Sequence, residues 1–395
     1  MHVDTSSAQD DERVDGESHG NALAAALDAA ELALANRFGS AITLSKPEDL
    51  AGSGPAVVVR ATVASSPFSL PRTLVIKHYP EPDDDASDPF AAEAVSYQLF
   101  TALTSEDRMC PELLGHDVNH RVLVLSDLGS APTLADKLRM SDARVAEGTL
   151  LSWARALGRM HATTAHREAD FNALLRRFGG QPASEDTEAA DSADELPGVL
   201  SDVLGVATPE AVAERVRLAS RRLDEGEYRA FSPVDLAPEN NLVTSDGVRF
   251  LDFEHGRVRN AMIDVAHLRV PFAFWRGALA LPAGMSEAMI AAWRAEVTGI
   301  WPRLADDDEF ASALLDSHIA CVWTQTAREL PGLTDASDTG STSRAAALES
   351  WWRELAARAD HSDTDGIAEH AASVAAAIER RFGPGLELAL YPAFR

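Results

Sequence analysis

The feature that most constrains this chain of 395 residues is an acidic stretch near its middle, Phe231–Gly256, with the sequence FSPVDLAPENNLVTSDGVRFLDFEHG. Asp235 precedes Asn240 by five residues, a turn follows at 244–248, and an apolar run then ends in Asp252. Turn residues between two apolar runs predict a β-hairpin. We therefore expect Asp235 and Asn240 on the loop before this hairpin, and Asp252 at the end of its second strand.

This order of carboxylate, amide and carboxylate is typical of phosphoryl transfer from ATP. The reaction needs one carboxylate to orient and deprotonate an attacking hydroxyl, and an amide plus a second carboxylate to hold Mg²⁺ on the phosphates. The pattern D-x4-N followed by D-F-E indicates the catalytic core of a kinase. The simpler alternative is a hairpin whose acidic side chains are only solvated.

The lysines give an independent indication. The chain has only three lysines beside 32 arginines. Lys46 and Lys137 lie in polar loop-like or helix-surface sequence, whereas Lys77 lies in the strand-like run Leu74–Tyr79. Burying an unpaired ammonium is costly. Lys77 therefore predicts a buried carboxylate partner and a phosphate that meets it.

Glu93 is the expected partner of Lys77. It lies sixteen residues further on, in a segment at 90–100 whose pattern predicts a helix with Ala94, Tyr97 and Phe100 on the inner face. A strand lysine paired with the glutamate of the next helix is aimed at the α- and β-phosphates of a nucleotide. Without Lys77, the simpler interpretation of Glu93 is a surface carboxylate.

Together these motifs resemble the aminoglycoside phosphotransferase and choline-kinase-like family, a branch of the protein-kinase-like fold, from about residue 50 to residue 272. The resemblance implies an α+β, bilobal fold with a small β-rich N-lobe and a large helical C-lobe. It implies that Lys77 contacts the nucleotide phosphates and that Glu93 orients it. It also implies that Asp235 is the catalytic base and that Asn240 and Asp252 are the metal ligands.

The same resemblance extends to the nucleotide-binding segments. The stretch Val122–Gly129 matches the family's strand-to-hinge segment, where the carbonyl of Ser126 and the amide of Leu128 would bind the adenine edge. Asp264 matches a family aspartate with a structural rather than a catalytic role.

A glycine-containing turn lies 25 residues before Lys77, and it includes Gly52, Ser53 and Gly54. The β-run that follows predicts a hairpin whose backbone amides approach the phosphates. An ordinary hairpin turn is the alternative, because a G-x-G turn by itself is a weak signal.

The chain departs from the family pattern at two points. Pro233 stands where the family has a histidine two residues before the catalytic aspartate. Asn241 directly follows Asn240, so spacing alone selects Asn240 as the ligand. In the helix expected at 145–165, His161 shares an apolar face with Trp153 and its neighbours, which favours a core or supporting histidine over a base.

The composition and sequence patterns suggest a domain organisation. We expect a disordered tail at 1–19, an N-lobe at 20–128, and a C-lobe at 129–395 with a flexible acidic insert at about 180–197. Within the N-lobe, the leucines and alanines of Asn21–Phe38 predict an amphipathic helix packed on the lobe.

The net charge of −27 disfavours binding to nucleic acids or anionic membranes, because both need basic patches. It would suit a cationic substrate, or it only keeps the protein soluble. No apolar run approaches 18 residues and the first 20 residues do not resemble a secretory signal, so we expect a cytoplasmic protein. Cys110 and Cys321 are isolated, which predicts neither a zinc site nor a disulfide.

Three functional classes remain. The favoured class is an ATP- and Mg²⁺-dependent kinase that phosphorylates a hydroxyl of a small molecule such as an aminoglycoside, amino alcohol or sugar, with GTP as another possible donor. The alternatives are a catalytically silent nucleotide-binding regulatory protein and a protein kinase. The last is disfavoured because only 12 residues separate Asp252 from Asp264, which is short for a peptide-docking segment. The sequence identifies neither the acceptor nor the oligomeric state.

Overall fold

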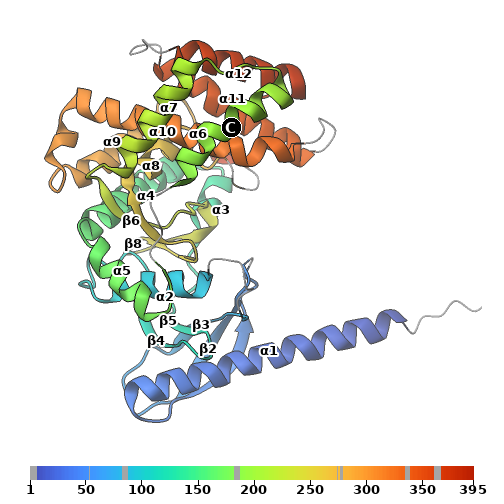
Figure 1. Cartoon of the computed structure of the whole chain (residues 1–395). Helices are drawn as coiled ribbons and strands as arrows, with labels where there is room; N and C mark the ends of the chain where they lie inside the picture. Colours follow the sequence, from blue (N-terminus) through green and yellow to red (C-terminus); the bar gives the residue numbers. More distant parts are fainter. Residues whose placement is uncertain are drawn as a thin grey trace, which may run out of the picture. The chain divides into compact units, whose positions relative to one another are not determined.

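The structure is a computed structural model that describes residues 7–52, 54–81, 88–181, 187–273, 275, 279–333, 339–359 and 366–395. The chain divides into two compact units, and Figure 1 labels most of their helices and strands. Unit 1 comprises Met1–Ser130, Ala173–Gln181 and Phe253–His255, and unit 2 comprises Ala131–Asn172, Pro182–Asp252 and Gly256–Arg395. The first boundary between the units comes after Ser130, two residues beyond the expected boundary after residue 128. The two short segments Ala173–Gln181 and Phe253–His255 also belong to unit 1.

Unit 1 is built on a five-stranded antiparallel sheet with the strand order β1-β2-β3-β5-β4. Its strands are β1 (Thr43–Asp49), β2 (Val57–Ser65), β3 (Thr73–His78), β4 (Leu113–Asp117) and β5 (Val122–Ser126). The central strand β3 is rich in β-branched and apolar residues, which suit a sheet buried on both faces. This β-rich unit, followed by a mainly helical one, confirms the predicted fold class.

Helix α1 (Ser7–Phe38) covers one face of this sheet. Small residues such as Ala26, Ala30 and Ala33 are fully buried against strand residues that include Leu74 and Ile76. The predicted helix at 21–38 is therefore present and packs as expected. The structure differs from the sequence prediction further upstream, because α1 already begins at Ser7, within the stretch expected to be a disordered tail.

Helix α2 (Pro89–Thr101) covers the opposite face of the sheet. Side chains alternate along a strand, so Lys77 points away from the face that Leu74 and Ile76 present to α1. The α2 helix begins at Asp88, whose side chain accepts a hydrogen bond from the Phe90 amide, with proline at the first helical position. The predicted inner face is confirmed, since Ala94, Tyr97 and Phe100 are at most 1% exposed.

Unit 2 is mainly helical and carries two small antiparallel sheets, β6–β9 and β7–β8. Its strands are β6 (Arg229–Ser232), β7 (Asn241–Thr244), β8 (Gly247–Phe250) and β9 (Arg257–Asn260). Its helices are α3 (Leu134–Arg139), α4 (Ala143–Thr164), α6 (Thr187–Val199), α7 (Glu210–Asp224), α8 (Ala261–Ala266), α9 (Met285–Val297), α10 (Asp307–Glu329), α11 (Thr339–Ala359) and α12 (Ile367–Phe382). Helix α5 (Glu168–Arg177) runs from unit 2 into unit 1.

The acidic insert is not wholly irregular. Residues 182–186 lie outside the described residues, but α6 begins at Thr187 and continues into a π-helical turn at Leu200–Leu204. Alanine and glutamate favour helix, and the apolar Ala193 and Leu196 are fully buried. Composition alone therefore overstates the flexibility of this segment.

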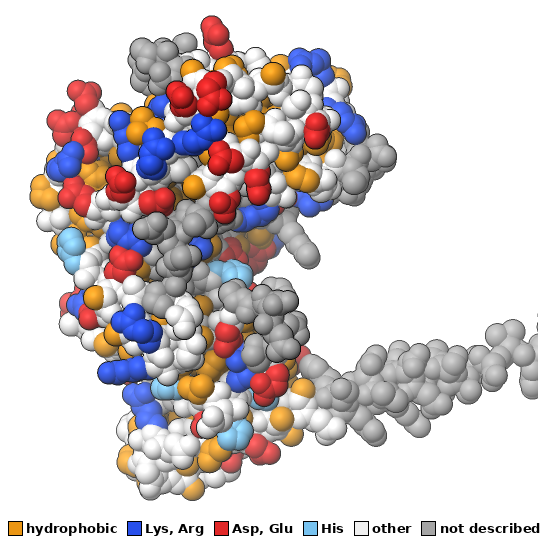
Figure 2. All heavy atoms as spheres, in the orientation of Figure 1, with side chains coloured by type: hydrophobic (Ala, Val, Ile, Leu, Met, Phe, Trp, Pro, Cys, Tyr) orange, Lys and Arg blue, Asp and Glu red, His pale blue; other side chains and the backbone are white. Residues whose placement is uncertain are grey.

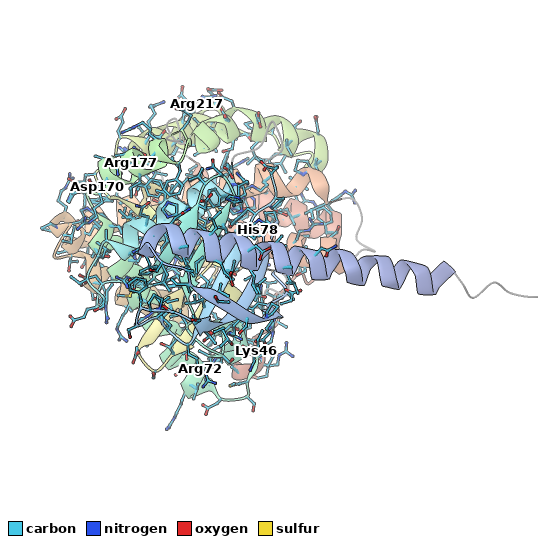
Figure 3. All side chains as sticks on the ribbon, turned by 90° about the horizontal axis from the view of Figure 1, so that it is seen from below. Lys46, Arg72, His78, Asp170, Arg177 and Arg217 are labelled. Atoms are coloured by element: carbon cyan, nitrogen blue, oxygen red, sulfur yellow. The ribbon has the colours of Figure 1, made fainter. Side chains whose placement is uncertain are left out.

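The charged side chains are distributed over the surface. Figure 2 shows acidic and basic side chains interspersed over the helices of unit 2 on the face that is seen. In unit 1, Lys46 lies exposed at the rim of the view in Figure 3, while α1 runs along the sheet. Among the described helices, none combines the length and the apolar character that crossing a bilayer requires.

The tryptophans of the C-terminal helices lie in the core. Trp293, Trp323, Trp351 and Trp352 are at most 1% exposed, so these large aromatic side chains pack in the core of unit 2. His318 lies among them, with its ring 5.8 Å from that of Trp351. Within the described residues, neither ring nitrogen of His318 has a hydrogen-bond partner. The packing therefore depends on His318 being neutral.

We predict that protonation of His318 opposes folding. Burial, followed by the charges of Arg269, Arg358 and His267, lowers its pKa to about 3, whereas an unfolded chain protonates histidine near pH 6.5. Because the unfolded state binds more protons between these values, the free energy of unfolding falls as the pH drops below about 6.5. The slope contributed by this histidine is about 1.4 kcal/mol per pH unit.

The variant His318→Leu should remove that slope. Denaturant unfolding at a series of pH values from 6 to 4.5 would measure it, with His166→Asn at an exposed position as the control. An unchanged slope in His318→Leu would contradict the prediction.

Candidate active site

The lysine and glutamate singled out in the sequence form a buried ion pair in unit 1. Lys77 Nζ lies 2.6 Å and 2.9 Å from the two carboxylate oxygens of Glu93. Glu93 is fully buried and the Lys77 side chain is 11% exposed. Strand β3 and helix α2 hold the two residues, so packing of the helix on the sheet fixes the ammonium in one place. A bound phosphate can meet a lysine that is held in this way.

The Glu93 carboxylate has two further donors. The backbone amide of Phe253 donates to its Oε1 at 3.1 Å, and the Tyr79 hydroxyl donates to its Oε2. The Phe253 ring is fully buried, with its centroid 5.0 Å from that of Tyr97 and 5.7 Å from that of Phe100. Glu93 therefore orients the lysine and also holds the residue that follows Asp252 in the chain.

The glycine-containing turn connects β1 and β2 of the same unit, as the sequence predicts. A Cβ on Gly52 would lie 2.8 Å from the Val58 side chain, and one on Gly54 would lie 3.1 Å from Glu254 Oε2. A side chain at position 52 would therefore clash with Val58, and one at position 54 would require the Glu254 carboxylate to shift slightly. Ser53, the third residue predicted for this loop, lies outside the described residues.

The segment predicted to bind adenine follows β5. The Ser126 hydroxyl accepts a hydrogen bond from the Glu112 amide at 2.9 Å, and within the described residues no hydrogen bond is made by the Leu128 amide. Asp127 between them accepts from Arg60 Nε at 2.9 Å and from the Gly129 amide at 2.8 Å. Burial alone would raise the pKa of the Asp127 carboxyl, but the hydrogen bonds from Arg60 and other groups lower it. This carboxylate fixes the segment.

In unit 2, Asp235 stands on the loop between β6 and β7. Its side chain is exposed. Oδ1 accepts a hydrogen bond from the Ala237 amide at 2.8 Å, and Oδ2 accepts one from Asn240 Nδ2 at 3.1 Å. The loop is thus closed by the aspartate and the amide that the sequence pairs, and the carboxylate remains accessible to a hydroxyl.

The backbone just before Asp235 is strained. Val234 has φ of +66°, and the Asp235 amide donates to the Pro233 carbonyl at 2.8 Å across it. A β-branched residue rarely adopts a positive φ, at a cost on the order of 1–3 kcal/mol. Ser232 Oγ stabilises the turn by accepting a hydrogen bond from the Val234 amide at 3.0 Å. This serine holds the loop in a chain that has Pro233 in place of a histidine.

A buried polar network holds the Ser232 side chain in place. Its hydroxyl donates to Asp264 Oδ1 at 2.9 Å and accepts from Arg259 Nε at 3.0 Å. Arg259 also pairs with Asp264, which is fully buried. Burial would raise the pKa of the Asp264 carboxyl, but the charge of Arg259 and the bonds from His161 and Ser232 hold it well below its usual range. Asp264 therefore stays ionised and anchors the loop.

His161 completes this network. Its Nε2 lies 3.1 Å from Asp264 Oδ2, and Trp293 Nε1 donates to its Nδ1 at 2.9 Å. Because a tryptophan nitrogen can only donate, Nδ1 accepts and Nε2 carries the proton. Helices α4 and α9 approach closely at Gly158, where a Cβ would lie 2.9 Å from the Trp293 carbonyl. Both ring nitrogens are engaged, which agrees with a supporting role and not with a base.

The structure distinguishes the two adjacent asparagines. Asn241 is 1% exposed. Its Oδ1 accepts from Trp153 Nε1 at 2.9 Å and its Nδ2 donates to the Ala237 carbonyl at 2.6 Å. Asn240 is half-buried, and its Nδ2 donates to Asp235, which leaves Oδ1 as the amide atom that can face a cation.

Asp252 comes at the same end of the β7–β8 hairpin as Asn240. The Leu251 amide donates to the Asn240 carbonyl at 2.8 Å, next to the pair Asn241 and Phe250 in the hairpin register. Asp252 itself has φ of +63° and is half-buried. Within the described residues no three His, Cys, Asp or Glu side chains form a metal cluster. An amide oxygen with one carboxylate nevertheless fits Mg²⁺, which takes its other ligands from water and phosphates.

Sequence reasoning missed several of these groups, among them Tyr79, Asp127 and Ser232. Tyr79 could have been found, because it follows Lys77 at the two-residue spacing of a strand face. Asp127 and Ser232 have no comparable signal, since their partners Arg60 and Asp264 lie 67 and 32 residues away.

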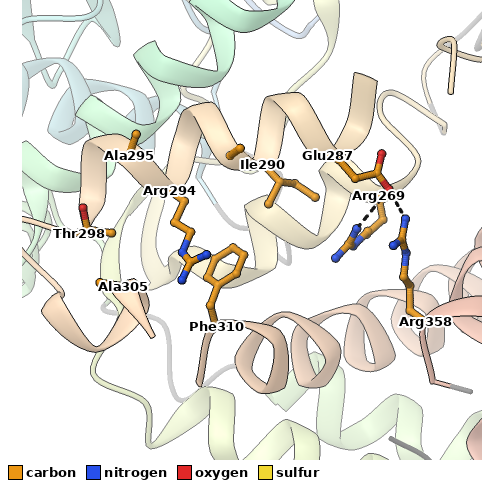
Figure 4. A pocket seen from close by; sticks show the side chains of 10 residues that line it. Arg269, Glu287, Ile290, Arg294, Ala295, Thr298, Ala305, Phe310 and Arg358 are labelled. Atoms are coloured by element: carbon orange, nitrogen blue, oxygen red, sulfur yellow. Dashed lines mark hydrogen bonds and ion pairs between the residues drawn. The ribbon is translucent and has the colours of Figure 1, made fainter. Parts of the chain in front are cut away.

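A depression with a volume of about 580 Å³ lies along α9 and α10 of unit 2. Figure 4 shows Arg269 and Arg358 both directed at Glu287. The Arg294 guanidinium lies over the Phe310 ring, 4.5 Å from its centroid. None of the ten residues that line it belongs to the loop or hairpin described above.

Comparisons with known proteins relate the fold to solved structures. The sequence matches no family model and no curated protein. The structure is similar to choline kinase from Cryptosporidium parvum, with a TM-score of 0.50 and 10% identity over 82% of this chain and 93% of that chain. It also matches a choline/ethanolamine kinase family protein from Mesorhizobium loti, with a TM-score of 0.47 and 18% identity over 84% of this chain and 93% of that chain. The likeness to the choline kinase shows the kinase-like fold.

The two asparagines provide a matched test of the site. We predict that Asn241→Ala lowers the free energy of unfolding by about 1–3 kcal/mol, because it leaves the buried Trp153 Nε1 without its acceptor. We predict that Asn240→Ala changes stability by less than about 0.5 kcal/mol and weakens binding of nucleotide with Mg²⁺. Denaturant unfolding and calorimetry would measure both effects. A large loss of stability in Asn240→Ala, together with weaker nucleotide binding in a stable Asn241→Ala, would refute this assignment of the two asparagines.

Proposed function

We propose that the protein is an ATP- and Mg²⁺-dependent phosphotransferase that moves the γ-phosphate of ATP to a hydroxyl of a small molecule. The main support for the proposal is the set of hydrogen bonds that the Glu93 carboxylate accepts. This one buried carboxylate holds both Lys77 Nζ and the Phe253 amide. The residue before Phe253 is Asp252, so one contact ties the phosphate-binding lysine to the segment that supplies a metal ligand.

Each residue has a distinct part in the proposed reaction. Lys77 would bind the α- and β-phosphates as a compact positive charge. Asp235 would accept the proton of the acceptor hydroxyl while that oxygen bonds to the γ-phosphorus. The bond between this phosphorus and the bridging oxygen then breaks, and ADP leaves. Asn240 and Asp252 would hold Mg²⁺, which when bound neutralises the charge that develops on the phosphates.

A small acceptor is favoured over a protein substrate by the segment after Asp252. Residues Arg257–Asn260 form β9, which pairs along its length with β6, and α8 follows directly. Since regular structure takes up these residues, they offer no extended platform for a peptide.

We predict that Asp235→Asn lowers the rate of transfer by roughly 10²–10⁴-fold, the contribution of a general base, while ATP affinity stays nearly unchanged. Assays with a panel of alcohols, amino alcohols, sugars and aminoglycosides would measure it, with ATP and GTP compared as donors. Activity within a few-fold of the parent protein would remove Asp235 as the base. Nucleotide binding without any metal-dependent transfer or hydrolysis in the parent protein would instead identify a silent regulatory protein.

We predict that Asp252→Ala weakens nucleotide binding only when Mg²⁺ is present, because the carboxylate acts through the metal. Calorimetry with Mg²⁺ and with a chelator would separate the two conditions. Asp246→Asn removes an exposed carboxylate from the turn of the same hairpin and serves as the control. Equal losses of affinity in both conditions would count against a metal role.

A further inference from the structure

A second cavity lies beside the catalytic loop of unit 2. It has a volume of about 100 Å³, room for one compact polar group, and Val234 contributes to its wall. Val234 is the strained residue directly before Asp235. Three arginines, Arg257, Arg259 and Arg328, line the same cavity. We call it the arginine pocket.

The fold brings these arginines together from distant parts of the chain. Arg257 and Arg259 alternate along β9 and therefore share one face of the strand. Ser232, the last residue of β6, pairs with Arg257, and the loop that carries Asp235 starts from this point. Arg328 comes from the last turn of α10, one turn after Thr324 and Gln325, which also line the pocket.

The three arginines of the pocket differ in how far they are exposed to solvent. Arg259 is 7% exposed and is held by Asp264 and Ser232. Arg257 is half-buried and Arg328 is exposed. Arg259 is thus part of the support of the loop, whereas Arg257 and Arg328 are positioned to meet a molecule that enters. A guanidinium has five N–H donors, so an arginine that has one partner can still bind a ligand.

The neighbouring histidine is kept neutral mainly by burial. His267 also lines the pocket. Burial is the main cause that lowers its pKa to about 4; the charges of Arg259 and Arg328 act in the same direction and that of Asp264 in the opposite one. The imidazole is therefore neutral at pH 7 and adds no charge. A lining of guanidinium groups favours carboxylate or phosphate oxygens and disfavours an ammonium group.

We propose that the acceptor of the phosphotransfer carries a compact oxyanion, a carboxylate or a phosphate, which binds Arg257 and Arg328 in the arginine pocket while the acceptor's hydroxyl faces Asp235. This inference rests on the proposed function and specifies its substrate class. It replaces the cationic acceptor that the net charge of −27 suggested. Net charge describes the whole surface, whereas the acceptor meets the few residues beside Asp235.

A matched set of acceptors tests the charge preference. Glycerol, glycerate, glycerol 3-phosphate and 2-amino-1,3-propanediol share a three-carbon hydroxylated skeleton and differ in charge. We predict that at least one of the two anions has a kcat/KM about tenfold or more above that of glycerol, the effect of one charge-assisted hydrogen bond. Preference for glycerate identifies a carboxylate, and preference for glycerol 3-phosphate a phosphate. Preference for glycerol or for the amine would overturn the inference and leave the proposed function intact.

Arginine variants assign the preference to the pocket. The ratio of kcat/KM for the anion to that for glycerol should fall about tenfold or more in Arg257→Gln and in Arg328→Gln. It should be largely retained in Arg328→Lys, which keeps the charge. Arg303→Gln, an exposed arginine paired with Glu227 and Glu309, is the control and should keep the parent ratio. An equal fall in Arg303→Gln, or no fall in either pocket variant, would overturn the inference.

Thermal unfolding gives a readout that does not depend on transfer. The protein is first saturated with a non-hydrolysable ATP analogue and Mg²⁺, and acetate or inorganic phosphate is then added as the probe. We expect at least one probe to raise the Tm of the parent protein and of Arg303→Gln, and to raise that of Arg328→Gln less. Equal shifts in all three, or no shift in the parent protein, would refute an oxyanion site. The probe could raise the Tm of the parent protein and of Arg303→Gln more than that of Arg328→Gln while no acceptor is phosphorylated. That result would support an oxyanion site in the arginine pocket and would contradict the proposed function.

Discussion

The buried ion pair between Lys77 and Glu93 is the interaction on which unit 1 depends. Two charges are removed from water, which is costly unless further hydrogen bonds satisfy them. The Tyr79 hydroxyl and the Phe253 amide supply those bonds to Glu93. The sheet and α2 must pack closely to exclude water, and the pair in turn fixes their register. Removing either partner would leave an uncompensated buried charge, so the lysine that is suited to binding phosphate is also tied to the stability of the fold.

Unit 2 uses the same principle around Asp264. This buried carboxylate is ionised because Arg259, His161 and Ser232 surround it. Ser232 connects this network to the backbone, because its Oγ accepts a hydrogen bond from the amide of Val234 in the strained turn. The strain is stored directly before Asp235, where a fixed position of the carboxylate matters for accepting a proton. Only two residues of chain, Pro233 and Val234, therefore separate Ser232 of this structural network from the proposed catalytic group.

Much of the fold was predictable because its signals are local. The hairpin at 241–250, the helix that carries Glu93 and the strand that carries Lys77 follow from turn residues, side-chain periodicity and β-branched runs. The start of α1 at Ser7 and the helix α6 were not predicted. Their acidic, polar composition resembles that of flexible segments, and composition does not report the burial of Ala193 and Leu196 against other helices.

The sequence by itself determined the kinase-like fold and predicted the class of chemistry, because Lys77, Glu93, Asp235 and Asp252 occur at spacings that indicate a kinase. Tertiary structure alone decided which asparagine is buried, since Asn241 is identified only by its contact with Trp153, 88 residues away. It also decided that Arg257 and Arg328 line one pocket beside Val234. The physical reason is that backbone hydrogen bonds and periodicity act over a few residues, whereas buried polar contacts join residues wherever packing brings them together.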